Sequence, residues 1–136
     1  MSDIRLVYDW LQHSKNNLIV ASHSFNDLYP KQTEIVCYLS HQCAETALKA
    51  YLVFLDIEPP KIHNLVELCN LCIEQDNEFS IIKESCARLT PYGVETRYPN
   101  ELDVDDKIAE QALMLAQKVY DFCVSKIPDN KTVPPI

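Results

Sequence analysis

The sequence predicts an all-α fold, an antiparallel up-and-down bundle of about five helices. Apolar residues recur three or four positions apart over long stretches, as they do on the buried face of a helix. Prolines fall between these stretches, where they would end a helix and begin a loop. The chain holds a single glycine, Gly93, and this scarcity argues against a sheet protein with many tight turns.

The two N-terminal helices are predicted over about residues 3–27 and 33–57. Pro30 lies in the connection between them, and Thr33 has the side chain of an N-cap for the second. The second helix ends before the Pro59-Pro60 pair. Because its C-terminal half is apolar nearly all round, we expect this helix at the centre of the bundle.

Three more helices carry the same signals, a polar residue at the start and a proline or glycine at the end. We predict them over about 65–74, from Asp76 or Asn77 to Pro91, and from an Asp103 cap to Pro128.

At 136 residues, the chain is of one-domain size. We assign residues 1–127 to the helical domain. Residues 128–136 hold three prolines and no apolar period, so we expect a flexible C-terminal tail.

Charge and composition exclude several functions. The formal net charge of −8 opposes non-specific binding of nucleic acid. One glycine cannot supply the Gly-rich phosphate loops of P-loop or dinucleotide-binding proteins. The first ten residues carry Asp3, Arg5 and Asp9, which is unlike a signal peptide, and no apolar run is long enough to cross a membrane. We therefore expect a cytoplasmic protein.

Six cysteines lie inside apolar patterns, and we interpret them as free, buried thiols. Cys69 and Cys72 form a C-x-x-C pair, for which a redox or metal role is the alternative. The pair falls within a predicted helix, on the same side as Leu65 and Leu68, and no second pair of ligands accompanies it. We predict no metal site and no cofactor.

A polar stripe marks the second helix. His41, Glu45 and Lys49 are spaced four apart, with Gln42 beside them. On the helix expected at the centre, such residues must either line a groove or satisfy one another, although a solvated face remains an alternative. His63, just before the third helix, has the position of a cap or loop histidine.

The irregular segment before the last helix contains Arg97 and Tyr98. An arginine can clamp a phosphate and a tyrosine can stack on a base, whereas the alternative is an Arg97 salt bridge to one of the many acids. The sequence shows no nucleophile motif, no H-E-x-x-H and no other pattern of a catalytic site. We assign no catalytic residue.

Several of these residues occur together in a known family. The chain resembles the HEPN domain (higher eukaryotes and prokaryotes nucleotide-binding) of the small stand-alone prokaryotic type, over about residues 3–127. The resemblance rests on Trp10-Leu11, Asn17-Leu18, the run from His41 to Ala50, His63-Asn64-Leu65 and Arg97-Tyr98-Pro99.

The resemblance implies a helical homodimer that binds a nucleotide or small anion and pairs with a minimal nucleotidyltransferase, as in toxin-antitoxin modules. Ribonuclease toxins of the superfamily carry an Arg, four to six residues and then a His, a motif that this chain lacks. We therefore expect a non-catalytic binding module. The alternatives are an RNA-cleaving toxin with an atypical site and a purely structural adaptor. The candidate ligand-binding residues are His41, Gln42, Glu45, Lys49, His63, Arg97 and Tyr98.

Overall fold

The computed structural model describes residues 3–93 and 104–127, and in them the predicted all-α bundle is confirmed. These ranges contain five α-helices, two short 3-10 helices and no strand. The α-helices are α1 (Ile4–Asn26), α2 (Thr33–Phe54), α3 (Leu65–Gln75), α4 (Lys83–Leu89) and α5 (Asp106–Ser125), and the 3-10 helices are η1 (Asn77–Ile82) and η2 (Thr90–Tyr92).

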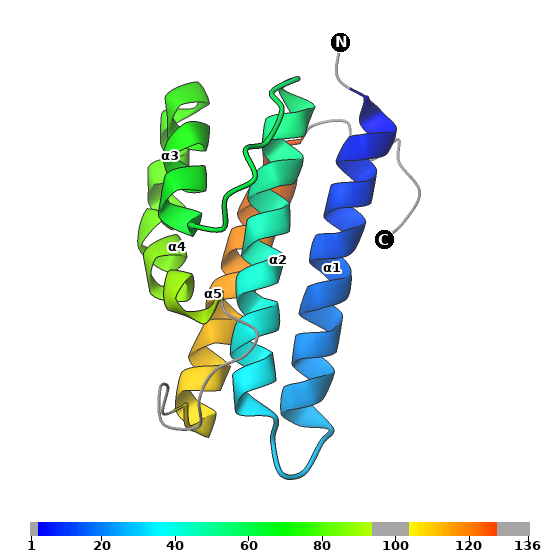
Figure 1. Cartoon of the computed structure of the whole chain (residues 1–136), viewed down its shortest axis with the longest axis vertical. Coiled ribbons are helices and arrows are strands. Elements are labelled where there is room, and N and C mark those ends of the chain that lie inside the picture. Colours follow the sequence, from blue (N-terminus) through cyan, green and yellow to red (C-terminus); the bar gives the residue numbers. More distant parts are fainter. Residues whose placement is uncertain (1–2, 94–103, 128–136) are drawn as a thin grey trace.

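Helix α2 lies at the centre, with α1 on one side, α3 and α4 on the other, and α5 packed along it (Figure 1). Helix α1 runs antiparallel to α2. The connection 55–64 runs back along α2 instead of reversing the chain, so α3 begins beside the middle of α2 and runs in the same direction (Figure 1). The place of the connection is fixed by the His63 carbonyl, which accepts a hydrogen bond from His41 of α2.

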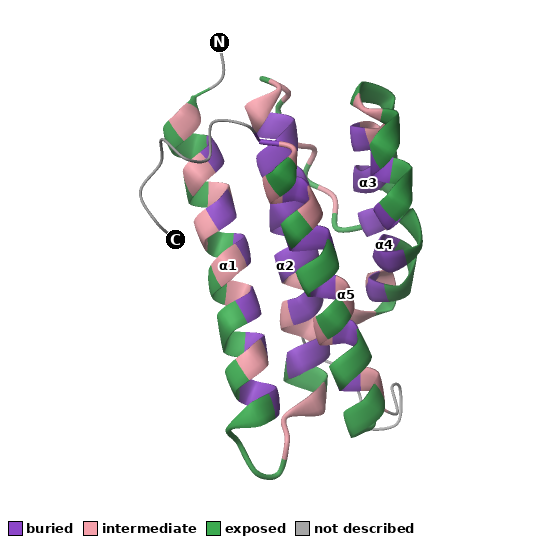
Figure 2. Cartoon of the chain, turned by 180° about the vertical axis from the view of Figure 1, so that it is seen from behind, coloured by how far each residue is buried: buried purple, intermediate pink, exposed green. Residues whose placement is uncertain are grey.

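The central position of α2 is confirmed by its burial. Buried residues occupy almost all its sides from Cys43 onward, whereas α1 and α5 bury one face each (Figure 2). Leu48 and Leu52 are completely buried and share the core with Leu11 of α1 and Phe79 of η1.

The structure corrects two of the predicted helix starts. Gln32 takes the N-cap position of α2, so Thr33 is the first helical residue and not the cap. Helix α5 is capped by Asp105, whose carboxylate accepts a 2.8 Å hydrogen bond from the backbone of Ile108. Asp103, the predicted cap, lies outside the described residues. The spacing of the apolar residues predicts where a helix lies, but it does not show which of two acidic residues two positions apart is the N-cap.

All six cysteines are buried and unpaired, as predicted. The thiol of Cys69 lies 3.6 Å from the backbone oxygen of Phe79, and that of Cys72 lies 3.9 Å from the backbone oxygen of Leu48. Burial raises the pKa of Cys43 to about 12. Within the described ranges, no group of three or more His, Cys, Asp or Glu residues is placed to hold a metal ion.

None of the helices in the described part of the chain combines the length and the apolar character that a membrane span requires.

Candidate functional site

His41 lies in the interior of the bundle, with no exposed surface. Its Nε2 donates to the backbone oxygen of His63 at 3.0 Å, and its Nδ1 lies 3.1 Å from the side-chain amide of Gln42. Burial lowers the pKa of His41, because the charged ring would lose its hydration. Both ring nitrogens are therefore engaged, and His41 ties the 55–64 connection to α2.

Gly93 closes the other side of this ring. A Cβ atom built at this position would lie 2.7 Å from His41 Nε2 and 2.9 Å from Cε1. The backbone of Gly93 has an ordinary negative φ of −75°, so the requirement here is for space and not for an unusual conformation. The one glycine of the chain thus lets the segment after α4 approach the buried histidine.

A second group of contacts surrounds Glu45. Its carboxylate accepts hydrogen bonds from Lys49 Nζ at 3.2 Å and from His63 Nδ1 at 3.0 Å. Only 4% of Glu45 and 6% of Lys49 is exposed, whereas the His63 side chain is 73% exposed. The polar stripe predicted on the central helix is thus not a solvated face, because its members satisfy one another.

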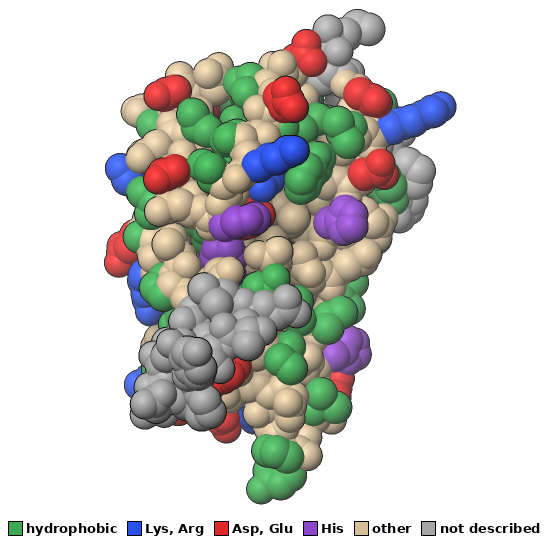
Figure 3. All heavy atoms as spheres, in the orientation of Figure 1, with side chains coloured by type: hydrophobic (Ala, Val, Ile, Leu, Met, Phe, Trp, Pro, Cys, Tyr) green, Lys and Arg blue, Asp and Glu red, His purple; other side chains and the backbone are tan. Residues whose placement is uncertain are grey.

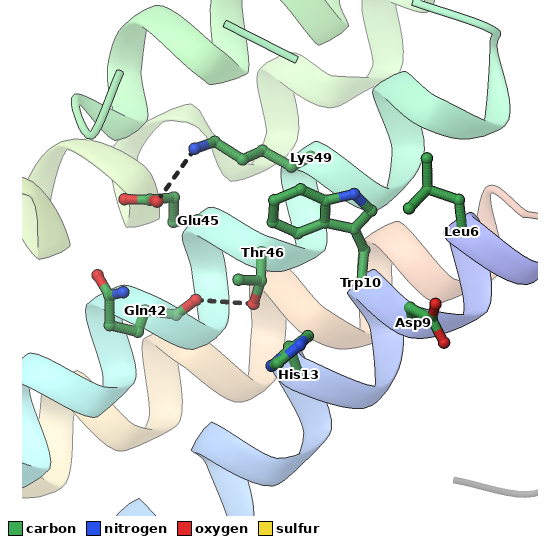
Figure 4. Close-up of a pocket in the computed structure, with 8 residues that line it drawn as sticks. All are labelled: Leu6, Asp9, Trp10, His13, Gln42, Glu45, Thr46 and Lys49. Carbon is green, nitrogen blue, oxygen red and sulfur yellow. Dashed lines mark hydrogen bonds and ion pairs between the residues drawn. The ribbon is translucent and has the colours of Figure 1, made fainter. Parts of the chain in front are cut away.

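Part of the same stripe lines a pocket between α1 and α2, with a volume of about 460 Å³. Trp10 and His13 project from α1 toward Thr46 and Lys49 of α2 (Figure 4). The indole of Trp10 is half-buried, and Lys49 Nζ lies 5.8 Å from the centre of its ring. The lining residues are Leu6, Asp9, Trp10, His13, Gln42, Glu45, Thr46 and Lys49.

Five of the seven residues predicted for the site, His41, Gln42, Glu45, Lys49 and His63, form this continuous set of contacts. Arg97 and Tyr98 lie outside the described residues.

The α1 side of the pocket is what the sequence reasoning missed. Leu6, Trp10 and His13 follow one another at spacings of four and three, and they face residues of α2 spaced in the same way. Two such rows on consecutive antiparallel helices are the signal that could have located the pocket.

The electrostatics of the pocket do not favour a free anion. In the part of the chain that the structure describes, Lys49 is the only lysine or arginine in the lining. Its charge is already compensated by Glu45, while Asp9 adds a second carboxylate. The pocket instead offers an aromatic surface and, at its edges, the amide of Gln42 and the exposed ring of His13. This combination suits a flat, polar group that can stack on an indole and exchange hydrogen bonds.

Comparison with known proteins points to one family. The family model described as HEPN domain matches residues 7–127. A solved structure of an archaeal HEPN homologue superposes with a TM-score of 0.71 at 24% identity, covering 89% of this chain and 97% of that one. A structure from Thermus thermophilus gives a TM-score of 0.77 at 27% identity, covering 88% and 97%. Comparison with curated proteins finds no match.

Proposed function

The chain belongs to the HEPN domain family, and on this premise we propose that it is a non-catalytic module that binds a nucleotide through its base. The observation that carries the proposal is the pocket between α1 and α2, where the only tryptophan of the chain, Trp10, lies among hydrogen-bonding groups. Stacking of a base on an aromatic side chain contributes about 1–3 kcal/mol.

The phosphates of the nucleotide are expected outside this pocket. The Lys49 ammonium is paired with Glu45. The two carboxylates in the lining, Asp9 and Glu45, would repel a phosphate group. Arg97, which can clamp a phosphate, and Tyr98, which can stack on a base, remain candidates for further contacts with the nucleotide. We therefore propose that the base stacks on Trp10 and that Arg97 binds the phosphates.

Calorimetry with a panel of nucleotides tests this assignment. Trp10→Ala should weaken binding by roughly 5- to 150-fold, as expected when 1–3 kcal/mol of stacking is lost, and Trp10→Phe should retain most of the affinity. Tyr29→Ala is the matched control, because Tyr29 is 99% exposed in the α1–α2 connection, away from the pocket lining. A wild-type protein that binds no nucleotide, or a folded Trp10→Ala variant that binds equally well, would overturn the proposal.

We also propose the assembly that the family resemblance implies. The chain would form a homodimer and pair with a minimal nucleotidyltransferase. Co-expression with a nucleotidyltransferase encoded by a neighbouring gene, followed by sedimentation analysis of the purified material, tests both parts. If the two proteins sediment as separate species, the proposed pairing is wrong. If this chain sediments as a monomer, the proposed homodimer is wrong.

A second candidate, cleavage of RNA at an atypical site, is favoured by one observation. Glu45 accepts a 3.0 Å hydrogen bond from Nδ1–H of His63. In this tautomer Nε2 of the exposed ring carries the lone pair that a general base requires. His41 cannot serve in the same way, because it is buried and both its nitrogens are engaged. RNA cleavage that disappears in His63→Ala would support this candidate, whereas an inert wild-type protein would exclude it.

A further inference from the structure

A second hollow adjoins the pocket at the end of the bundle where α1 begins and α2 ends. Its volume is about 370 Å³, and Leu6 lines both it and the pocket described above. Along α1 the two hollows extend from Asp3 to His13, which is about 15 Å at 1.5 Å per residue. We call this continuous depression the α1–α2 groove.

The bottom and edges of the groove contain apolar side chains. Leu6 is 45% exposed and Trp10 is half-buried, and the far end adds Val53, Ile57 and Pro59. Exposed apolar surface inside a depression, with polar residues around it, is typical of a place where another chain binds.

The described residues that line the groove carry a net negative charge. Among residues 3–93 and 104–127, Lys49 is the one lysine or arginine in the lining, and its charge is compensated by Glu45. At the upper end of the molecule, acidic side chains and some basic ones lie among hydrophobic ones (Figure 3). Besides the paired Glu45, the carboxylates that line the groove are Asp3, Asp9, Asp56 and Glu58.

From this combination we infer that the groove docks a basic, amphipathic segment of a partner protein. Apolar side chains of the segment would cover Leu6 and Trp10, and its lysines or arginines would pair with the carboxylates at the edges. The repeated phosphates of a nucleic acid strand would be repelled by these carboxylates, and a second copy of this chain would bring the same acidic groove and the same net charge of −8. A basic partner is the occupant whose charge is complementary.

Synthetic peptides test the inference. The probe is an amphipathic peptide of about ten residues, the helical length that spans about 15 Å, with lysines on one face, leucines on the other and no aromatic residue. The control peptide has the same sequence with glutamate in place of each lysine. Trp10, as the only tryptophan, reports occupancy of the groove by its fluorescence, and calorimetry measures the affinity. The lysine peptide should bind and shift the emission, whereas the glutamate peptide should do neither.

Two charge variants locate the contact. Asp9→Asn/Glu58→Gln removes two exposed carboxylates from the groove and should weaken binding roughly three- to tenfold, as expected for two exposed ion pairs. Glu74→Gln/Glu84→Gln removes the same charge from exposed positions on α3 and α4 and should leave the affinity nearly unchanged. Equal weakening by both pairs would show attraction to the overall charge and overturn the inference.

Two further results would also overturn it. One is binding of both peptides alike, and the other is binding of the lysine peptide without any change in Trp10 emission.

Leu6→Ser, at an exposed position, should weaken binding without loss of stability. The titrations contain no nucleotide, so peptide docking and the proposed nucleotide binding succeed or fail separately.

Discussion

At Gly93, two opposing effects of a methyl group can be compared. Replacing glycine by alanine where the backbone conformation is ordinary stabilises a protein by about 0.4–1 kcal/mol, because the unfolded chain loses freedom. The φ of −75° at Gly93 meets that condition. The added Cβ would, however, lie 2.7 Å from Nε2 of a histidine ring that has no exposed surface. Overpacking of this kind costs about 1–3 kcal/mol, so the clash should prevail.

We therefore predict that Gly93→Ala lowers the free energy of unfolding by about 1–2 kcal/mol, the overpacking cost less the backbone gain. Urea unfolding measures it. A double-mutant cycle with His41→Ala supplies the control, because the alanine at position 93 should cost much less once the ring is absent. The same loss in both backgrounds would show that the ring is not the cause.

The ion pair between Glu45 and Lys49 lies almost wholly inside the bundle, with 6% and 8% of the two side chains exposed. A buried pair often adds little net stability, because both ions lose their hydration, but removing one partner leaves the other charge uncompensated. Without Glu45, Lys49 would keep its contact with the ring of Trp10, whose centre lies 5.8 Å from Nζ, but would lose the carboxylate that balances its charge.

Glu45→Gln is accordingly expected to destabilise the fold by about 3 kcal/mol. The double variant Glu45→Gln/Lys49→Met, which removes both charges and keeps the volume, should recover much of that loss. Thermal and urea unfolding of the wild type, both single variants and the double variant measure the coupling. If the losses of the single variants simply add in the double variant, the pair is not energetically coupled.

Among the helices, α2 was the one whose place in the bundle and whose polar residues could be predicted best from the sequence. Its apolar surface placed it at the centre, and its polar stripe required partners. The sequence could not identify those partners, because the carbonyl of His63 and the close approach of Gly93 come from segments 22 and 52 positions away from His41. The α2–α3 connection illustrates the same limit, since no local pattern shows that residues 55–64 run back along α2.

Helix starts depend on one or two hydrogen bonds, and the cap of α5 offers a test. Asp105 accepts from the backbone of Ile108 at 2.8 Å, and loss of an N-cap costs about 0.5–2 kcal/mol. Asp105→Ala should lower the free energy of unfolding by about 1 kcal/mol. Asp106→Ala, in the first turn, removes a charge that favours the helix dipole and should cost about 0.3–1 kcal/mol. A greater loss in Asp106→Ala than in Asp105→Ala would contradict the observed cap.

At the scale of the whole molecule, composition and periodicity were sufficient to predict the fold class, because a helical core is encoded by repeated local spacings. The lining of the candidate pocket was anticipated only in part. Gln42, Glu45 and Lys49 were identified from α2, whereas Asp9 and Trp10 on α1 were not. A pocket depends on how two helices face each other, and this relation is tertiary.

The six cysteines allow the packing of the whole core to be probed at once. The thiolate is the reactive form, and burial raises the pKa of Cys37 and Cys43 to about 12, which leaves about one thiolate in 100,000 at neutral pH. Burial also raises the pKa of Cys72 and Cys123. Cys69 differs, because a hydrogen bond with Cys86 lowers the pKa of its thiol.

A thiol-specific disulfide reagent should therefore find almost no reactive group in the native protein at neutral pH, and six after unfolding in urea without reductant. Any slow native reaction should begin at Cys69 and disappear in Cys69→Ser, because its thiol has the lowered pKa although it is buried. Fewer than six groups in the unfolded chain would reveal a disulfide. Rapid reaction of the native protein would mean that the core opens to the reagent, since a closed core shields every one of these sulfurs.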